Sequence, residues 1–199
     1  MKKFILALAA VLCLGLTACG QTQGNASTSG SAAEPIGKYT AVIDIADYGT
    51  ITLELDGDSA PLTVANFVKL AKDGFYDGPT FHRIMDGFMM QGGDPKGNGT
   101  GGSEETIPGE FSANGYDNPI SHTRGTISMA RAQDPNSASS QFFICQADST
   151  FLDGNYAAFG HVTEGMDVVD AIAAVKTDEE SGKPVENVLI NSIEILEYT

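Results

Sequence analysis

The chain has 199 residues, of which 42% are apolar and 23 are glycine, a composition typical of one turn-rich globular domain with a core of its own. Its formal net charge is −15. An acidic surface repels phosphate backbones and anionic lipid head groups, so we expect no nucleic-acid partner.

The first 18 residues have the pattern of an export signal. Lys2 and Lys3 precede an apolar run at 4–16, which is shorter than the about 20 residues needed to cross a bilayer. The run ends in LTAC, which resembles the bacterial lipobox, a signal that is cut before a cysteine that then carries acyl chains. The resemblance implies lipidation of Cys19 and an extracytoplasmic, membrane-anchored lipoprotein. An ordinary cleaved signal followed by a chance cysteine is the alternative.

Residues 19–38 are rich in Gly, Ser, Thr and Ala, a composition typical of a flexible tether. Cys145 is the only cysteine after this segment, so an internal disulfide is impossible in the remaining chain, and we interpret Cys145 as a small buried apolar side chain. We divide the chain into a lipoprotein signal peptide at 1–18, the lipidated cysteine and tether at 19–38, and a folded domain at 39–199.

Most of the folded domain has the pattern of short strands. It opens with two alternating runs, 39–46 and 49–55, and the turn Asp47-Tyr48-Gly49 between them indicates a hairpin. The last run, 187–196, alternates again, and we expect it to pair with the first. Further strand-like runs lie at 80–84, 87–92, 125–130, 140–146 and 157–163.

Two helices are expected between these strands. In the first, Ser59 can cap the N-terminus, Pro61 suits the first turn, and Gly74 closes the segment. The second is indicated by apolar residues at helical spacing from Met166 to Val175. Many short strands, two helices and no alternating β-α units favour a mainly β, antiparallel barrel with peripheral helices.

Several motifs do not support a cofactor or a metal. Gly97–Gly102 matches the letters of the dinucleotide motif G-x-G-x-x-G, but no helical pattern follows it, so we expect a loop that turns tightly or approaches another segment. The histidines His82, His122 and His161 have no metal-ligand spacing, and we interpret His82 as a supporting core residue. We expect neither a cofactor nor a metal.

Arg83 is the residue that most needs an explanation. It stands among apolar residues in FHRIMDGFMM, and a permanent cation is costly to bury unless its donors are used. A structural ion pair for Arg83, and barrel core for the apolar residues, are open alternatives to a binding site. Strand parity allows several side chains to share one face: Arg83, Phe88, Met89 and Gln91 in one run, and Gln141 and Phe143 in another. A wall of apolar groups with one cation and two amides suits a proline-containing ligand.

Four blocks of the sequence resemble the cyclophilin-type peptidyl-prolyl cis-trans isomerases, in order and over nearly all of residues 39–199. They are FHRIMDGFMMQGGDPKGNGTGG, GTISMARA, NSASSQFFI and FLDGNYAAFGHVTEGMDVVDAI. The resemblance implies a closed eight-stranded antiparallel β-barrel capped by two α-helices, with an active groove on its outer surface.

The resemblance also implies roles, position by position. Arg83 would be the catalytic arginine, and the backbone of Ala130, Arg131 and Ala132 would hold the residue before proline. The groove and its rim would be lined by Phe88, Met89, Gln91, Gln141, Phe143, Phe151, Leu152 and Tyr156.

Three positions depart from the pattern of many eukaryotic family members, which have tryptophan at 151, histidine at 156 and asparagine at 131. Phe151 lacks the indole N–H, which puts tight cyclosporin binding in doubt. Tyr156 keeps a ring with a polar tip, so turnover is less affected. Arg131 is expected to alter peptide preference.

We therefore expect an enzyme that accelerates rotation about Xaa-Pro bonds in exported proteins, held at the membrane by its lipid anchor. Its partners would be Pro-containing segments of exported or cell-envelope proteins, and the resemblance favours a monomer. An alternative from another class is a non-catalytic binding module for Pro-containing segments of a partner protein. A general holdase would need an exposed apolar patch, of which this acidic sequence gives no sign.

Overall fold

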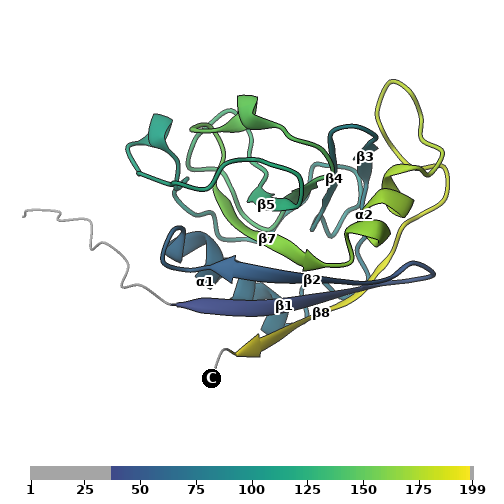
Figure 1. Cartoon of the computed structure of the whole chain (residues 1–199), viewed down its shortest axis with the longest axis horizontal. Helices are drawn as coiled ribbons and strands as arrows, with labels where there is room; N and C mark the ends of the chain where they lie inside the picture. The colour runs from purple at the N-terminus through teal and green to yellow at the C-terminus, as the bar shows by residue number, and fades with distance from the viewer. Residues whose placement is uncertain (1–36, 198–199) are drawn as a thin grey trace, which may run out of the picture. The chain divides into compact units, whose positions relative to one another are not determined.

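A computed structural model describes residues 37–197; the expected signal peptide, Cys19 and nearly all of the tether lie outside the described residues (Figure 1). Eight strands and two α-helices form the described part. They are β1 (Lys38–Ile45), β2 (Gly49–Asp56), α1 (Pro61–Lys72), β3 (Arg83–Met85), β4 (Met89–Gly92), β5 (Thr126–Met129), β6 (Phe142–Cys145), β7 (Ala158–Glu164), α2 (Met166–Ala173) and β8 (Ile190–Glu197). Each strand and helix that the sequence predicts is confirmed, with ends that differ by up to about three residues from those expected.

All eight strands belong to one antiparallel sheet with the order β3-β4-β6-β5-β7-β2-β1-β8. Figure 1 shows β1, β2 and β8 side by side, and β8 pairs with β1 as predicted. Closure of the barrel is only partial, because no ladder joins the end strands β3 and β8. Irregular backbone spans the gap instead: Phe81 N–H donates to the Val188 carbonyl at 2.9 Å, and Ile190 N–H donates to that of Pro79 at 2.9 Å. Pro79 has no N–H to extend a ladder.

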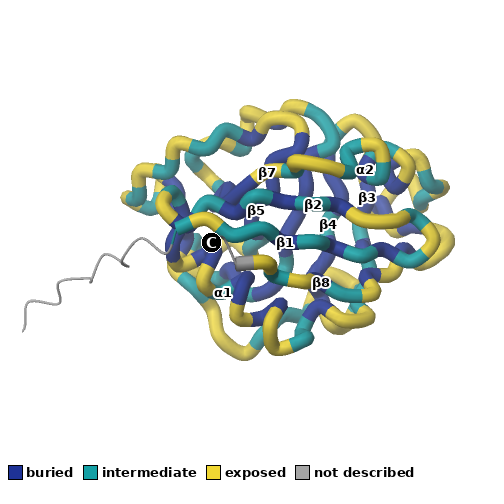
Figure 2. The backbone as a smooth tube through the Cα atoms, turned by 60° about the horizontal axis from the view of Figure 1, so that its bottom comes forward, coloured by how far each residue is buried: buried dark blue, intermediate teal, exposed yellow. Residues whose placement is uncertain are grey.

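The core lies inside the curl of this sheet. Alternate residues of β1 and β2 are fully buried, as the period of two requires. Phe67 of α1 lies at the centre of an aromatic cluster. Its ring centroid is 5.1 Å from the ring centroid of Tyr76, 5.5 Å from that of Phe142 and 5.2 Å from that of Phe159. In Figure 2 the buried segments fill the middle of the fold and the exposed ones gather in the connecting loops.

The start of α1 corrects one prediction. Ser59 does not cap the helix, because the N-cap residue is Ala60, whose methyl group cannot accept a hydrogen bond. The carboxylate of Glu110, distant in sequence and buried, accepts the Thr63 N–H at 2.8 Å instead. A negative charge at a helix N-terminus is favourable, which explains why a local cap is dispensable here. Gly74, at φ +72°, follows the helix end as predicted. Within residues 37–197, no helix has the length and apolar character that crossing a membrane requires.

Candidate active site

Four side chains form a row across the outer face of the sheet. The strand register places Arg83 of β3 opposite Gln91 of β4, Gln91 opposite Phe143 of β6, and Phe143 opposite Ser128 of β5. Residues opposite each other in neighbouring strands point to the same face. The neighbouring row, Ile84, Met90, Ile144 and Ile127, is buried on the inner face. The parity that the sequence suggested therefore places Arg83 and Gln91 outside the barrel core.

A second, smaller hydrophobic cluster lies on this outer face. Met89, Phe143 and Cys145 are buried there, apart from the main core. Phe88, Ala130, Leu152 and Tyr156 pack against them. The alternative that all these apolar residues are barrel core is therefore wrong, since they form a platform of their own beside Arg83.

Nine of the predicted site residues line one pocket of about 200 Å³ on this platform. At one side is Arg83, and the apolar floor comes from four side chains of three separate segments. The lining is Arg83, Phe88, Met89, Gln91, Ala130, Arg131, Phe143, Leu152 and Tyr156. The remaining three predictions lie at its border. Ala132 and Gln141 line an adjoining pocket of about 290 Å³, and Phe151 is 71% exposed with its ring 5.6 Å from that of Phe88.

Arg83 has no carboxylate partner within the part of the chain that the structure describes. Its Nη2 donates to the Met85 sulfur at 3.0 Å, a weak acceptor. The ion-pair interpretation of Arg83 is thus not supported. Most of the donors of this guanidinium remain available at the pocket.

Gln91 is held by a second amide rather than by Arg83. Its Nε2 donates to Oε1 of Gln141 at 2.8 Å, and Gln141 donates in turn to the carbonyl of Gly101 at 2.7 Å. Among the described residues no side-chain hydrogen bond joins Gln91 to Arg83. The pair of amides therefore fixes the middle of the groove to the glycine-rich loop.

The glycine-rich loop wraps around one buried carboxylate. Asp94 accepts the N–H groups of Lys96 at 2.8 Å, Asn98 at 3.0 Å and Gly99 at 2.6 Å. Burial alone would raise the pKa of Asp94, but these amides outweigh it and hold the pKa below its usual range. A Cβ at Gly101 would collide with the Asp94 carboxylate. The loop thus approaches another segment closely, as predicted, and no phosphate is needed to explain its glycines.

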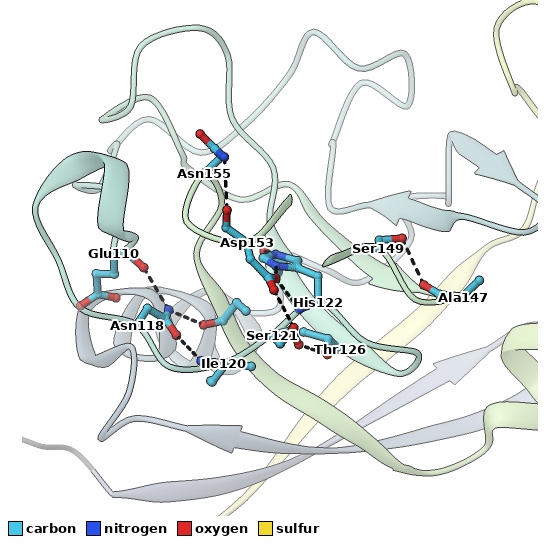
Figure 3. A network of polar contacts seen from close by, with 12 residues as sticks. Glu110, Asn118, Ile120, Ser121, His122, Thr126, Ala147, Ser149, Asp153 and Asn155 are labelled. Carbon is cyan, nitrogen blue, oxygen red and sulfur yellow. Dashed lines mark hydrogen bonds and ion pairs between the residues drawn. The ribbon is translucent and has the colours of Figure 1, made fainter. Parts of the chain in front are cut away.

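Behind the pocket lies a buried network centred on His122, which is 1% exposed (Figure 3). Its Nδ1 lies 2.8 Å from Oδ1 of Asp153, and its Nε2 lies 2.9 Å from the hydroxyl of Ser128. The imidazole also stacks on the Phe143 ring, with centroids 6.0 Å apart and planes 16° apart. Because Asp153 directly follows Leu152, the network supports two walls of the pocket at once.

The protonation state of this network follows from its surroundings. Burial lowers the pKa of His122, although the Asp153 carboxylate opposes this, so the imidazole is neutral at pH 7. Burial raises the pKa of Asp153, but hydrogen bonds from Ser121 and His122 outweigh it and keep the carboxylate ionised. The proton of His122 therefore sits on Nδ1, facing Asp153, and Nε2 accepts the hydroxyl hydrogen of Ser128.

The guanidinium of Arg131 donates its hydrogen bonds to backbone carbonyls of the protein itself. Its Nε and Nη2 donate to the Asn155 carbonyl at 3.0 and 2.9 Å, and its Nη1 donates to that of Ala132 at 2.9 Å. The guanidinium also lies over the rings of Phe111 and Tyr156, 5.1 and 4.9 Å from their centroids. These contacts of Arg131 hold the loop that carries Tyr156 in place.

Two interpretations of single residues are confirmed. Cys145 is fully buried, and burial raises its pKa to about 12, so its thiol is not a nucleophile at neutral pH. His82 is 7% exposed and burial lowers its pKa, so it is buried as expected, and it also borders a pocket beside Arg83. Across residues 37–197, no three His, Cys, Asp or Glu side chains gather as a metal site would require.

Sequence reasoning missed the residues that support the site from behind and beside it. Ser128 shares the parity of the row, which was the one local signal available. His122 and Asp153 come from two loops, and nothing in either loop predicts that they meet. The segment 176–185, which lies against β3, was also missed.

Comparisons with known proteins agree with one another. A family model described as "Cyclophilin type peptidyl-prolyl cis-trans isomerase/CLD" matches residues 40–195. "Peptidyl-prolyl cis-trans isomerase-like 1" of Rhizopus delemar is 50% identical over 131 residues, which cover 65% of this chain and 78% of the relative. A "Probable peptidyl-prolyl cis-trans isomerase" of Brucella suis biovar 1 is 44% identical over 169 residues, covering 79% of this chain and 81% of the relative. The crystal structure of a Cryptosporidium parvum cyclophilin type peptidyl-prolyl cis-trans isomerase in the presence of the dipeptide Ala-Pro gives a TM-score of 0.73 at 31% identity, covering 80% of this chain and 99% of that one.

Proposed function

The chain belongs to the cyclophilin-type peptidyl-prolyl cis-trans isomerases, and on that premise we propose that it isomerises Xaa-Pro bonds of exported proteins with Arg83 as the catalytic residue. The observation that supports this role is the pocket of about 200 Å³, in which an arginine without a carboxylate partner among the described residues borders an apolar floor. A proline ring fits such a floor, and its nitrogen would lie within reach of the cation.

A single donor suffices for this reaction because of how the peptide bond changes. Resonance opposes rotation about C–N by about 18–20 kcal/mol. In the twisted transition state this resonance is lost, and the lone pair returns to the prolyl nitrogen, which becomes a hydrogen-bond acceptor only then. The N–H groups of Arg83 would therefore bind the transition state better than the ground state. By analogy with an oxyanion-hole donor, this is worth about 3–4 kcal/mol, or a rate increase of several hundredfold.

The other residues of the pocket would hold the substrate while its carbonyl swings. Met89, Phe143 and Leu152 supply apolar surface for the ring. The N–H of Ala130 donates to the backbone carbonyl of Gln141 at 2.9 Å, and the N–H of Ala132 donates to the hydroxyl oxygen of Ser137 at 3.0 Å. Between them, the N–H of Arg131 has no hydrogen bond to any described residue, which leaves it for the residue before proline.

The test is cis–trans exchange of an Ala-Pro-Phe peptide, followed by NMR with the full chain. We expect Arg83→Ala to lower kcat/KM by several hundredfold while peptide binding is retained. Arg124→Ala is the matched control, because Arg124 pairs with Asp170 at 2.7 Å and lines none of the site pockets. Binding without acceleration by the parent would instead favour the binding module. Equal loss in both variants would refute the role of Arg83.

The proposal that the substrates are exported proteins depends on the sequence of residues 1–19. The basic start, the apolar run and LTAC support export and acylation of Cys19. Growth of an expressing bacterium with labelled fatty acid should label the protein. Cys19→Ser should abolish the label and Cys13→Ser should keep it; label that survives Cys19→Ser would contradict the anchor.

A further inference from the structure

The segment 176–185 forms a hairpin that lies against Arg83 (the yellow-green loop between α2 and β8 in Figure 1). Its arms are joined by Val185 N–H to the Lys176 carbonyl at 2.9 Å and by Asp178 N–H to the Lys183 carbonyl at 2.8 Å. The tip is fixed to β3, where Ile84 N–H donates to the Gly182 carbonyl at 2.8 Å. A Cβ at Gly182 would meet the Ile84 oxygen at 3.1 Å and Arg83 Cγ at 3.3 Å. The hairpin is therefore a fixed wall beside the catalytic arginine.

Charged residues of this hairpin line two pockets that share Arg83 and Ser181. Asp178, Glu179 and Glu180 line the first, of about 230 Å³. Lys183 lines the second, of about 410 Å³. This second pocket is completed by His82, Arg83, Gln91, Gly97, Asn98 and Gly99.

Two cationic side chains, Arg83 and Lys183, line the pocket of about 410 Å³. Neither Arg83 nor Lys183 pairs with a carboxylate among residues 37–197, although the chain carries a net charge of −15. The side-chain oxygen of Asn98 already accepts from the Thr100 N–H at 3.0 Å and hydroxyl at 2.7 Å, so its NH₂ group is what remains for a ligand. Two cations and an amide donor suit a carboxylate.

The position of this pocket connects it to the proline site. It shares Arg83 and Gln91 with the pocket of about 200 Å³. A peptide that leaves the proline seat over these two residues would enter it directly. We propose that the pocket of about 410 Å³ is a substrate subsite that binds an acidic side chain close to the isomerised proline, with Lys183 as the specificity-determining residue. This inference builds on the proposed function and names the class of substrate that the same site prefers.

The test uses the full chain and matched proline peptides that carry Glu or Gln at each position within three residues of the proline. For at least one position we expect the parent to favour Glu over Gln by about fivefold in kcat/KM, the upper range for one solvent-accessible ion pair. Lys183→Met should reduce this ratio to about one, and Lys183→Glu should invert it. High salt should weaken the preference of the parent.

Lys176→Met is the matched control, because it removes an equal charge from the base of the same hairpin, outside the pocket. It should leave the Glu/Gln ratio unchanged. A ratio of one in the parent at every position, or equal loss in both methionine variants, would overturn the subsite. Binding affinities of the same peptides give the Glu/Gln ratio independently of turnover. Failure of the parent to accelerate the Gln peptides would count against the proposed function, and the affinity ratio would still decide the subsite.

Discussion

Replacing His122 by alanine removes a side chain that supports the pocket of about 200 Å³ from behind, and it changes none of the residues that line this pocket. The change deletes the bond to Asp153, worth about 1.5 kcal/mol for an acceptor that is partly exposed, and leaves the buried hydroxyl of Ser128 without this partner, at about 1–3 kcal/mol. It also leaves a space beneath the Phe143 ring. We expect the free energy of unfolding to fall by about 3–5 kcal/mol, less than the typical total of about 5–15 kcal/mol, so the protein should still fold.

Urea denaturation measures this loss, and NMR exchange of a proline peptide measures its effect on the site. Because Phe143 and the loop after Leu152 lose a common support, kcat/KM should fall at least tenfold even where the protein is fully folded. His161→Ala is the control, since that side chain is exposed and lies outside the network. A stability loss below about 1 kcal/mol, or unchanged kcat/KM in folded His122→Ala, would refute the reasoning.

Three further predictions concern the same structure. Burial lowers the pKa values of His82 and His122, so the unfolded state binds more protons than the folded state below a pH of about 6.5. The free energy of unfolding should therefore fall from pH 7.5 to 5, by at most about 1.4 kcal/mol per pH unit for each histidine. A flat pH profile in urea titrations would contradict this. Gly101→Ala should cost at least about 2 kcal/mol in thermal or urea unfolding because the new Cβ meets the Asp94 carboxylate, whereas Gly78→Ala, with open space around it, should cost only the about 1–2 kcal/mol of its positive φ. Arg131→Ala should lower kcat/KM for all proline peptides by a similar factor, because it releases the loop of Tyr156; a change confined to some peptides would support the expectation from sequence that Arg131 sets preference.

Local patterns predicted the elements of this fold well. Alternation in β1, β2 and β8 and helical spacing in α1 and α2 are properties of neighbouring residues, and the structure confirms them. What failed depends on partners far along the chain. Glu110 stabilises the start of α1 from 47 residues away, so Ser59 was an unnecessary cap. The expected closed barrel is only partly closed, because β3 has three residues and Pro79 lacks an N–H, so no ladder joins β3 to β8.

The candidate site shows the same division. The apolar floor and Arg83 lie in continuous motifs, and the structure brings them into one pocket. The alignment of Arg83, Gln91 and Phe143 depends on the register of strands of three or four residues, which no short alternating pattern specifies. The contacts of Arg131 and the network of His122 are made by loops, where side-chain direction follows from tertiary contacts alone.

The hairpin at 176–185 has a second consequence, for how the protein meets extended chains. β3 ends the sheet, and an edge strand offers its outward backbone groups to any passing strand, which is a route to aggregation. The outward N–H of Ile84 is already taken by Gly182, and the tip of the hairpin lies over this edge. A peptide bound at Arg83 would therefore lie across the face of the sheet and could not extend it at β3.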